Sequence, residues 1–159
     1  MKAVIVYDSQ FGNTEAVAKA IASGMGPAVE ARAVKVDAAG PADVKGAALL
    51  VAGSPVQAWR ATPKMVEFLK KLEGEDLAGV KAAAFDTRIP GRIGGLFGTA
   101  SKKLSGHLQK LGYELVDGPQ GFHVTGTEGP LADGELQRAT AWGRSLAAKV
   151  GGQALKRAS

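Results

Sequence analysis

The sequence predicts one α/β domain in which helices cover both faces of a five-stranded parallel sheet with the strand order 2-1-3-4-5. Three observations predict this fold. Short apolar runs alternate along the chain with segments that carry apolar residues at helical spacing. Parallel neighbours require helical crossovers, which are right-handed and place helices on both faces. The 159 residues suffice for a single domain, and five strands favour this order over the six-stranded alternative.

The first strand and helix are predicted from an apolar run followed by a helical pattern. Residues 3–7 are apolar, as in a strand buried on both faces. Apolar residues then recur at positions 17, 21 and 25, which gives a helix one buried face. The cluster of Gly24, Gly26 and Pro27 is typical of a helix end. The chain therefore opens with a βα unit.

The next two strands are predicted to differ in burial. Residues 29–36 alternate imperfectly between apolar and polar, which favours a strand near the sheet edge. Residues 47–52 are continuously apolar, which indicates a central strand buried on both faces. Thr62 is a good helix cap and Pro63 suits the first helical turn. A second helix therefore follows the third strand.

The second half of the chain predicts a fourth strand at residues 80–85 and a glycine-rich stretch without regular pattern at 86–98. A helix over residues 100–111 follows, which Gly112 closes. Tyr113 and Leu115, then Phe122 and Val124, predict one interrupted last strand, broken at residues 118–121.

The final helix is predicted to bury Trp142 in the core, because this tryptophan lies at helical spacing with apolar neighbours. We expect this helix to end at Gly151 and Gly152. The domain would then span residues 1–152, and residues 153–159 would form a frayed tail.

A polar turn between the first strand and the first helix is the strongest functional signal. Backbone NH groups and the positive end of the helix dipole meet there, which suits a phosphate. The turn lacks both the lysine of a triphosphate loop and the Gly-x-Gly-x-x-Gly pattern of a dinucleotide loop. The alternative is an ordinary strand-to-helix turn with Asn13 as N-cap. The residues of this turn are Ser9, Gln10, Phe11, Gly12, Asn13 and Thr14.

The predicted topology brings three segments together, namely residues 8–14, 53–62 and 86–98, because ligands of such sheets bind at the carboxyl ends of the strands. In the second segment, Pro55 rigidifies the chain and the amides of residues 56–58 can bond the polar edge of a flat ring. Trp59 can stack on such a ring, the alternative being a core or surface tryptophan. The candidate residues there are Ser54, Pro55, Val56, Gln57, Ala58 and Trp59.

These motifs resemble those of the flavodoxins. Residues 9–14 resemble the flavodoxin phosphate loop Ser/Thr-x-Thr-Gly-Asn-Thr, with Phe11 in place of a small hydroxyl residue. The start of the second segment, Gly53-Ser54-Pro55, resembles flavodoxins and the related quinone reductases. The resemblance runs from Lys2 to about Val150. It implies a flavodoxin-like three-layer sandwich with noncovalently bound FMN.

The resemblance also implies roles for residues. The turn at residues 9–14 would hold the FMN phosphate, and residues 54–59 would hold the ring together with Asp86, Thr87 and Arg88. No residue is expected to act as a catalytic acid or base, and no metal is expected. The third segment departs from the family because it lacks the tyrosine that covers the flavin. Either Ile93, Leu96 or Phe97 replaces that cover, or the segment is a mobile lid or partner-docking loop.

Charge is a second departure, because flavodoxins are typically acidic and this chain carries a formal charge of +5. Arg60, Arg88 and Arg92 lie in the segments expected to face the ring. Cations there stabilise anionic reduced flavin. The sequence therefore predicts a reduction potential above that of acidic flavodoxins.

The amino-acid composition argues against several other classes of function. The chain has no cysteine, which excludes thiol catalysis and thiolate metal sites. Its two histidines are too few and too isolated to indicate a metal site. Its scattered lysines and arginines do not indicate nucleic-acid binding. Neither a signal peptide nor a membrane span is recognisable, so we expect a cytoplasmic protein.

The expected function is that of an FMN electron carrier acting between redox partner proteins, a reductase and an acceptor. The first alternative is an FMN-dependent NAD(P)H:quinone reductase or a related oxidoreductase. A second is a domain that has lost its flavin and serves as a binding module. A phospho-receiver domain is disfavoured, because Asp8 stands alone and Gly53-Ser54 replaces the required aspartate.

Overall fold

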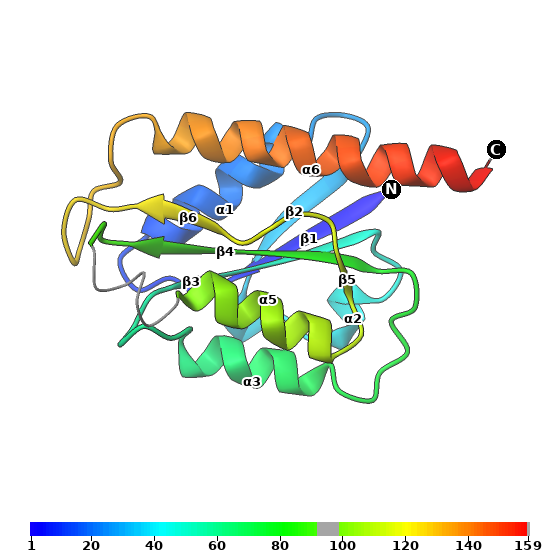
Figure 1. Ribbon diagram of the computed structural model, residues 1–159, viewed down its shortest axis with the longest axis horizontal. Helices are drawn as coiled ribbons and strands as arrows, with labels where there is room; N and C mark the ends of the chain where they lie inside the picture. Colours follow the sequence, from blue (N-terminus) through cyan, green and yellow to red (C-terminus); the bar gives the residue numbers. More distant parts are fainter. Residues whose placement is uncertain (92–98, 159) are drawn as a thin grey trace.

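The fold has three layers, with the sheet between two pairs of helices (Figure 1). The computed structural model describes residues 1–91 and 99–158, with side chains through residue 152. Helices α1 (Asn13–Gly24) and α6 (Glu135–Ala158) cover one face. Helices α3 (Pro63–Lys71) and α5 (Ala100–Lys110) cover the other. Thr62 caps α3 as predicted, since its hydroxyl accepts a hydrogen bond from the amide of Met65.

The sheet is parallel and has the order β2-β1-β3-β4-β5, which confirms the predicted topology. Strand β6 also pairs with β4, further along it than β5 does. The edge position is therefore filled by one interrupted strand, as predicted. The strands are β1 (Lys2–Tyr7), β2 (Glu30–Lys35), β3 (Leu49–Pro55), β4 (Lys81–Arg88), β5 (Glu114–Leu115) and β6 (Gln120–His123).

One predicted boundary of the edge strand and one predicted helix end were wrong. Gln120 and Gly121 were assigned to the break, but they pair with Phe85 and Asp86 and so belong to β6. The last helix does not stop at Gly151 and Gly152, because α6 continues to Ala158. Each glycine costs a helix only about 1 kcal/mol, and good helix formers follow at residues 153–158.

The central strands β3 and β4 run three residues beyond their predicted ends at Ala52 and Phe85. Their extensions pair with one another, with Ser54 opposite Asp86 and Pro55 opposite Thr87. Residues expected in loops thus lie in the sheet, where the ladder fixes their positions. The crossover from β2 to β3 is short and contains a 3-10 turn at Val36–Ala38 and the helix α2 (Pro41–Val44).

Apolar side chains fill both spaces between the sheet and the helices. On the α3 and α5 side, Leu50, Phe68 and Leu104 are buried. On the α1 and α6 side, Phe85 makes edge-on contacts with Phe122 and Trp142, at ring-centroid distances of 6.0 and 6.3 Å. Trp142 is buried, as predicted. Within the part of the chain that the structure describes, no helix has the length and apolar character of a membrane span.

Glu135 links the start of α6 to the edge of the sheet. One of its carboxylate oxygens accepts from the amide of His123 at 2.6 Å, and both oxygens accept from the guanidinium of Arg138. The hydrogen bonds from Arg138, with a smaller contribution from the His123 amide, hold the pKa of Glu135 at about 2.

We expect this carboxylate to make stability fall as the solution is acidified. Its folded pKa is below the unfolded value, so its contribution is complete above about pH 4.5 and is lost as the pH falls toward 2. Because Arg138 is partly exposed, the contribution is about 1–2 kcal/mol. Urea unfolding of wild type and Glu135→Gln at pH 7 and pH 3 measures it. The two proteins should differ at pH 7, and the difference should be smaller at pH 3; a gap independent of pH would contradict the assignment.

Candidate functional site

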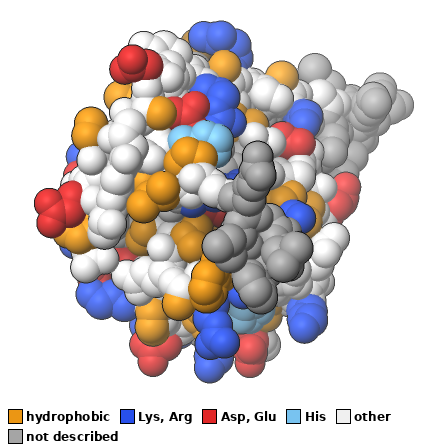
Figure 2. Space-filling model, turned by 60° about the vertical axis from the view of Figure 1, so that its left-hand side comes forward, with side chains coloured by type: hydrophobic (Ala, Val, Ile, Leu, Met, Phe, Trp, Pro, Cys, Tyr) orange, Lys and Arg blue, Asp and Glu red, His pale blue; other side chains and the backbone are white. Residues whose placement is uncertain are grey.

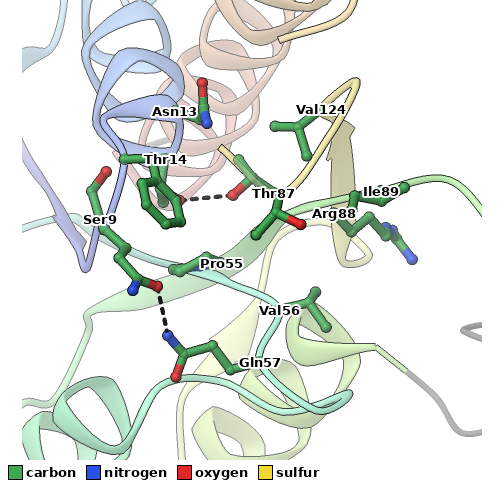
Figure 3. A pocket seen from close by; sticks show the side chains of 13 residues that line it. Ser9, Asn13, Thr14, Pro55, Val56, Gln57, Thr87, Arg88, Ile89 and Val124 are labelled. Carbon is green, nitrogen blue, oxygen red and sulfur yellow. Dashed lines mark hydrogen bonds between the residues drawn. The ribbon is translucent and has the colours of Figure 1, made fainter. Parts of the chain in front are cut away.

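A pocket of about 240 Å³ opens at the carboxyl ends of β1, β3 and β4, where the topology predicts a ligand site. Figure 2 views the molecule from this end and shows hydrophobic side chains gathered near the middle of the face. Figure 3 shows the labelled side chains converging from segments far apart in the sequence. The lining residues are Ser9, Gln10, Phe11, Asn13, Thr14, Pro55, Val56, Gln57, Thr87, Arg88, Ile89, Val124 and Thr127.

The start of α1 forms one end of this pocket. Gly12 is the N-cap, and its φ of 90° is a left-handed conformation that glycine adopts without strain. The hydroxyl of Ser9 accepts from the amides of Gly12 and Glu15, at 3.1 and 3.3 Å. Helix geometry leaves the amides of Asn13 and Thr14 without intrahelical acceptors. This end of the pocket therefore presents NH donors together with the positive end of a helix dipole.

Asn13 is not the N-cap of the helix, so that part of the alternative interpretation was wrong. It is the first helical residue, and its side-chain amide donates to the carbonyl of Glu128 at 3.1 Å. Gly129 packs directly against it, since a Cβ at Gly129 would lie 2.6 Å from Asn13 Oδ1. Asn13 thereby holds a fourth segment, residues 124–129, against the pocket.

This fourth segment, which contributes Val124 and Thr127 to the lining, was missed by sequence reasoning. It follows the edge strand, whereas the topological rule points only to strands beside the reversal of strand order. Its glycine-rich and threonine-rich composition is that of any turn. The contact with Asn13 joins residues that are far apart in the chain, so no local sequence pattern reveals it.

The second segment contributes Pro55, Val56 and Gln57 to the lining. The amide of Val56 donates to Thr87 O and that of Gln57 to Arg60 O, so these two predicted ring donors already have protein acceptors. The Gln57 side chain donates to Gln10 Oε1 at 3.2 Å, across the pocket mouth (Figure 3). Ser54 lies behind the lining, where its hydroxyl donates to Pro55 O and accepts from the amide of Thr62.

Beyond the lining, Gln57 and Arg60 exchange two backbone hydrogen bonds around a tight turn whose central residues are Ala58 and Trp59. Both central residues have positive φ, 48° and 62°, which costs about 1–2 kcal/mol each for non-glycine residues. The side-chain ammonium of Lys103 donates to the carbonyl of Trp59 at 2.8 Å. Trp59 is 44% exposed and does not line the pocket; its stacking on a ring stays a prediction.

The end of β4 forms the wall between the pocket and α5. Thr87 lines the pocket, and its hydroxyl shares a 2.7 Å hydrogen bond with the buried hydroxyl of Thr14, which ties β4 to α1. Asp86 is fully buried behind the lining, where one carboxylate oxygen accepts from the amide of Ser101 and the other lies 3.0 Å from Arg88 Nε. Burial raises the pKa of Asp86, although Ser101 and Arg88 oppose this shift.

Arg88 crosses over Gly121 on the neighbouring strand, where a Cβ would lie 1.7 Å from its guanidinium. Figure 3 shows this guanidinium directed away from the centre of the pocket. Because its Nε lies 3.0 Å from the carboxylate of Asp86, the charge of Arg88 is balanced by Asp86 and does not act as an isolated cation. Arg92 and the predicted covering residues Ile93, Leu96 and Phe97 lie outside the described residues.

The family model described as Flavodoxin matches residues 5–142. This chain belongs to the flavodoxin family. A flavodoxin from the domain Archaea superposes with a TM-score of 0.77 at 23% identity, covering 95% of this chain and 99% of that chain. Oxidised Flavodoxin 1 from Bacillus cereus gives 0.76 at 21% identity, covering 94% and 97%.

The same fold also occurs within larger proteins. The flavodiiron protein from Giardia intestinalis gives a TM-score of 0.77 at 20% identity, with 98% of this chain but only 37% of that chain covered. Comparison with curated protein sequences gave no significant match.

FMN is the cofactor that membership of the flavodoxin family implies, and the pocket fits it. Ser9 Oγ occupies an acceptor position at the start of α1 that a phosphate oxygen also satisfies. Among the described lining residues, Arg88 is the only charged one, so no carboxylate opposes a phosphate. The apolar surfaces of Pro55, Val56 and Val124 suit a flat ring.

The predicted residues thus fall into two groups. Those that line the pocket are Ser9, Gln10, Phe11, Asn13, Thr14, Pro55, Val56, Gln57, Thr87 and Arg88. Those that support it from behind or lie beyond it are Gly12, Ser54, Ala58, Trp59 and Asp86. Direct contact of any of them with FMN stays a prediction.

Proposed function

We propose that this flavodoxin-family protein is an electron carrier that receives electrons from one redox protein and delivers them to another. The observation that carries the proposal is the chemistry of the pocket lining. Among the described lining residues there is no carboxylate and no histidine, and the one cation is held by Asp86. Such a pocket binds and orients, but it supplies no group for proton transfer to a substrate. An electron carrier requires none.

The proposed roles follow from position. The amides at the start of α1, with the hydroxyls of Ser9 and Thr14 nearby, would hold the phosphate of FMN. Pro55, Val56 and Ile89 would exclude water from the ring. FMN supplies one-electron or two-electron redox chemistry, which the surrounding residues tune electrostatically.

The proposal is tested by loading the protein with FMN and measuring its electron transfer. The purified protein should bind FMN with one-to-one stoichiometry. Once reduced, it should be reoxidised by an electron-accepting protein such as cytochrome c. It should not oxidise NADPH steadily in the presence of a quinone unless a separate reductase is added. Steady NADPH turnover by the protein alone would establish the quinone reductase alternative, and a failure to bind FMN would reject both.

Because Arg88 and Asp86 balance one another, we expect Arg88→Ala to lower the reduction potential of bound FMN by tens of mV. At a pH high enough to keep Asp86 ionised, the variant leaves its carboxylate uncompensated behind the pocket wall, which disfavours anionic reduced flavin. A charge about 8 Å away acts by at most about 90 mV for one electron at an effective dielectric of about 20, and solvent screening reduces this.

The matched control is the double variant Asp86→Asn/Arg88→Ala, which removes both charges. Redox titration should return its potential to within a few mV of the wild type. An unchanged potential in the single variant would show that the pair is too far from the ring to tune it.

A further inference from the structure

The turn Gln57–Arg60 and the first turn of α5 form a continuous rim beside the pocket. Gln57 lines the pocket, and its backbone is hydrogen-bonded to that of Arg60. Lys103 on α5 reaches the carbonyl of Trp59, which joins the helix to the turn. We call these two segments, residues 57–60 and 100–103, the basic rim.

The basic rim breaks two local rules of protein structure. The first turn of α5 carries Lys102 and Lys103 and no acidic residue, although the helix dipole favours anions at this end. The adjoining turn has two successive non-glycine residues in the left-handed region, where glycine or asparagine is usual. Departures of this kind concentrate at functional sites, because stability alone selects against them.

The side chains of the basic rim indicate the kind of partner that it would bind. Arg60, Lys102 and Lys103 are exposed cations, and exposed apolar surface from Trp59 and Ile89 lies at or near the pocket edge. Among the described residues of the rim, no acidic side chain offsets these charges. A positive patch that adjoins apolar surface beside a redox cofactor steers a partner of the opposite charge toward it.

We propose that the basic rim is the docking surface for a redox partner whose own docking face is acidic. The proposal rests on the electron-carrier function above, and it adds the sign of charge of the partner. Docking there would bring the partner against the segment that lines the pocket, so electron transfer and recognition would use the same edge.

The test compares two acceptors with the same haem and opposite charge, native cytochrome c, which is basic, and cytochrome c with succinylated lysines, which is acidic. The FMN-loaded protein is reduced, and its reoxidation by each acceptor is followed by stopped flow from low to high salt. At low salt the succinylated acceptor should react at least tenfold faster, and salt should remove this preference.

Charge-reversed variants locate the effect. Arg60→Glu/Lys102→Glu should lose the preference for the succinylated acceptor or reverse it. The matched control is Lys70→Glu/Lys71→Glu in the last turn of α3, which changes net charge equally at exposed positions outside the rim. This control should retain most of the preference. FMN content, measured in each variant, confirms that the pocket is intact.

Three results would overturn the proposal. One is an equal effect of both variant pairs, which would mean that only net charge matters. Another is electron transfer without preference between the acceptors. The third is salt-sensitive binding to anionic lipid vesicles through the same rim without that preference, which would indicate a membrane surface instead. In all three the protein still carries electrons, whereas failure to bind FMN or to reduce either acceptor would reject the electron-carrier function itself.

Discussion

Ser9→Asp is expected to weaken FMN binding at least 100-fold while leaving the free protein as stable as the wild type or more so. The Ser9 hydroxyl accepts from two amides at the start of α1, and a carboxylate is an equally good acceptor there. Its charge also interacts favourably with the helix dipole, by up to about 1 kcal/mol. The same charge repels the phosphate by about 4 kcal/mol at about 4 Å and an effective dielectric of about 20. Solvent screening reduces this repulsion, and the repulsion that remains accounts for the expected 100-fold loss of FMN affinity.

The experiment separates the phosphate end of the pocket from its ring end. FMN and riboflavin are titrated by flavin fluorescence into wild type, Ser9→Asp and the neutral isostere Ser9→Asn. Only FMN binding by Ser9→Asp should show the large loss, because riboflavin has no phosphate. Thermal unfolding without ligand checks that the fold is retained. Equal loss of FMN and riboflavin would show that the phosphate lies elsewhere.

Gly143→Ala is expected to destabilise the protein by about 3 kcal/mol, and Gly24→Ala to do the same. A Cβ at Gly143 would lie 2.1 Å from the carbonyl oxygen of Ile21, and one at Gly24 would lie 2.0 Å from that of Thr140. These neighbours are backbone atoms of the opposite helix, so α1 and α6 must separate and lose apolar contacts. For a chain of this size the melting temperature should fall by about 10 °C.

The matched control is Gly106→Ala on α5, where a Cβ would meet no atom within 4 Å. This substitution should raise stability by about 0.5–1 kcal/mol through helix propensity alone. Urea unfolding of the three variants measures the contrast. A gain in stability for Gly143→Ala would show that α1 and α6 are packed less closely than the structure places them.

Much of the fold was predictable because its signals are local. Apolar runs such as residues 47–52 mark strands buried on both faces, and Thr62-Pro63 marks a helix start. The sequence was misleading where a local signal was weaker than its context. Gly151 and Gly152 resembled a helix end, but the residues beyond them favour helix and α6 continues.

Three of the segments that line the pocket were predictable from the sequence, whereas the fourth, residues 124–129, was not. Residues 9–14 and 53–57 carry motifs whose chemistry suits a phosphate and a flat ring, and topology places both at one edge of the sheet. The roles of individual side chains were harder to predict. Asp86 and Ser54 look like ligand contacts in the sequence, yet their hydrogen bonds within the protein place them behind the pocket wall.

The sequence by itself determined the order of the strands, the NH-rich turn that opens α1 and the absence of thiol chemistry, because these depend on residue types and short spacings. Only the tertiary structure decided that Asn13 holds residues 124–129 against the pocket and that Asp86 balances Arg88. Tertiary packing also brings Lys103 to the turn at Trp59. These contacts join residues from different elements, and their distances depend on how the helices pack on the sheet, which no local pattern encodes.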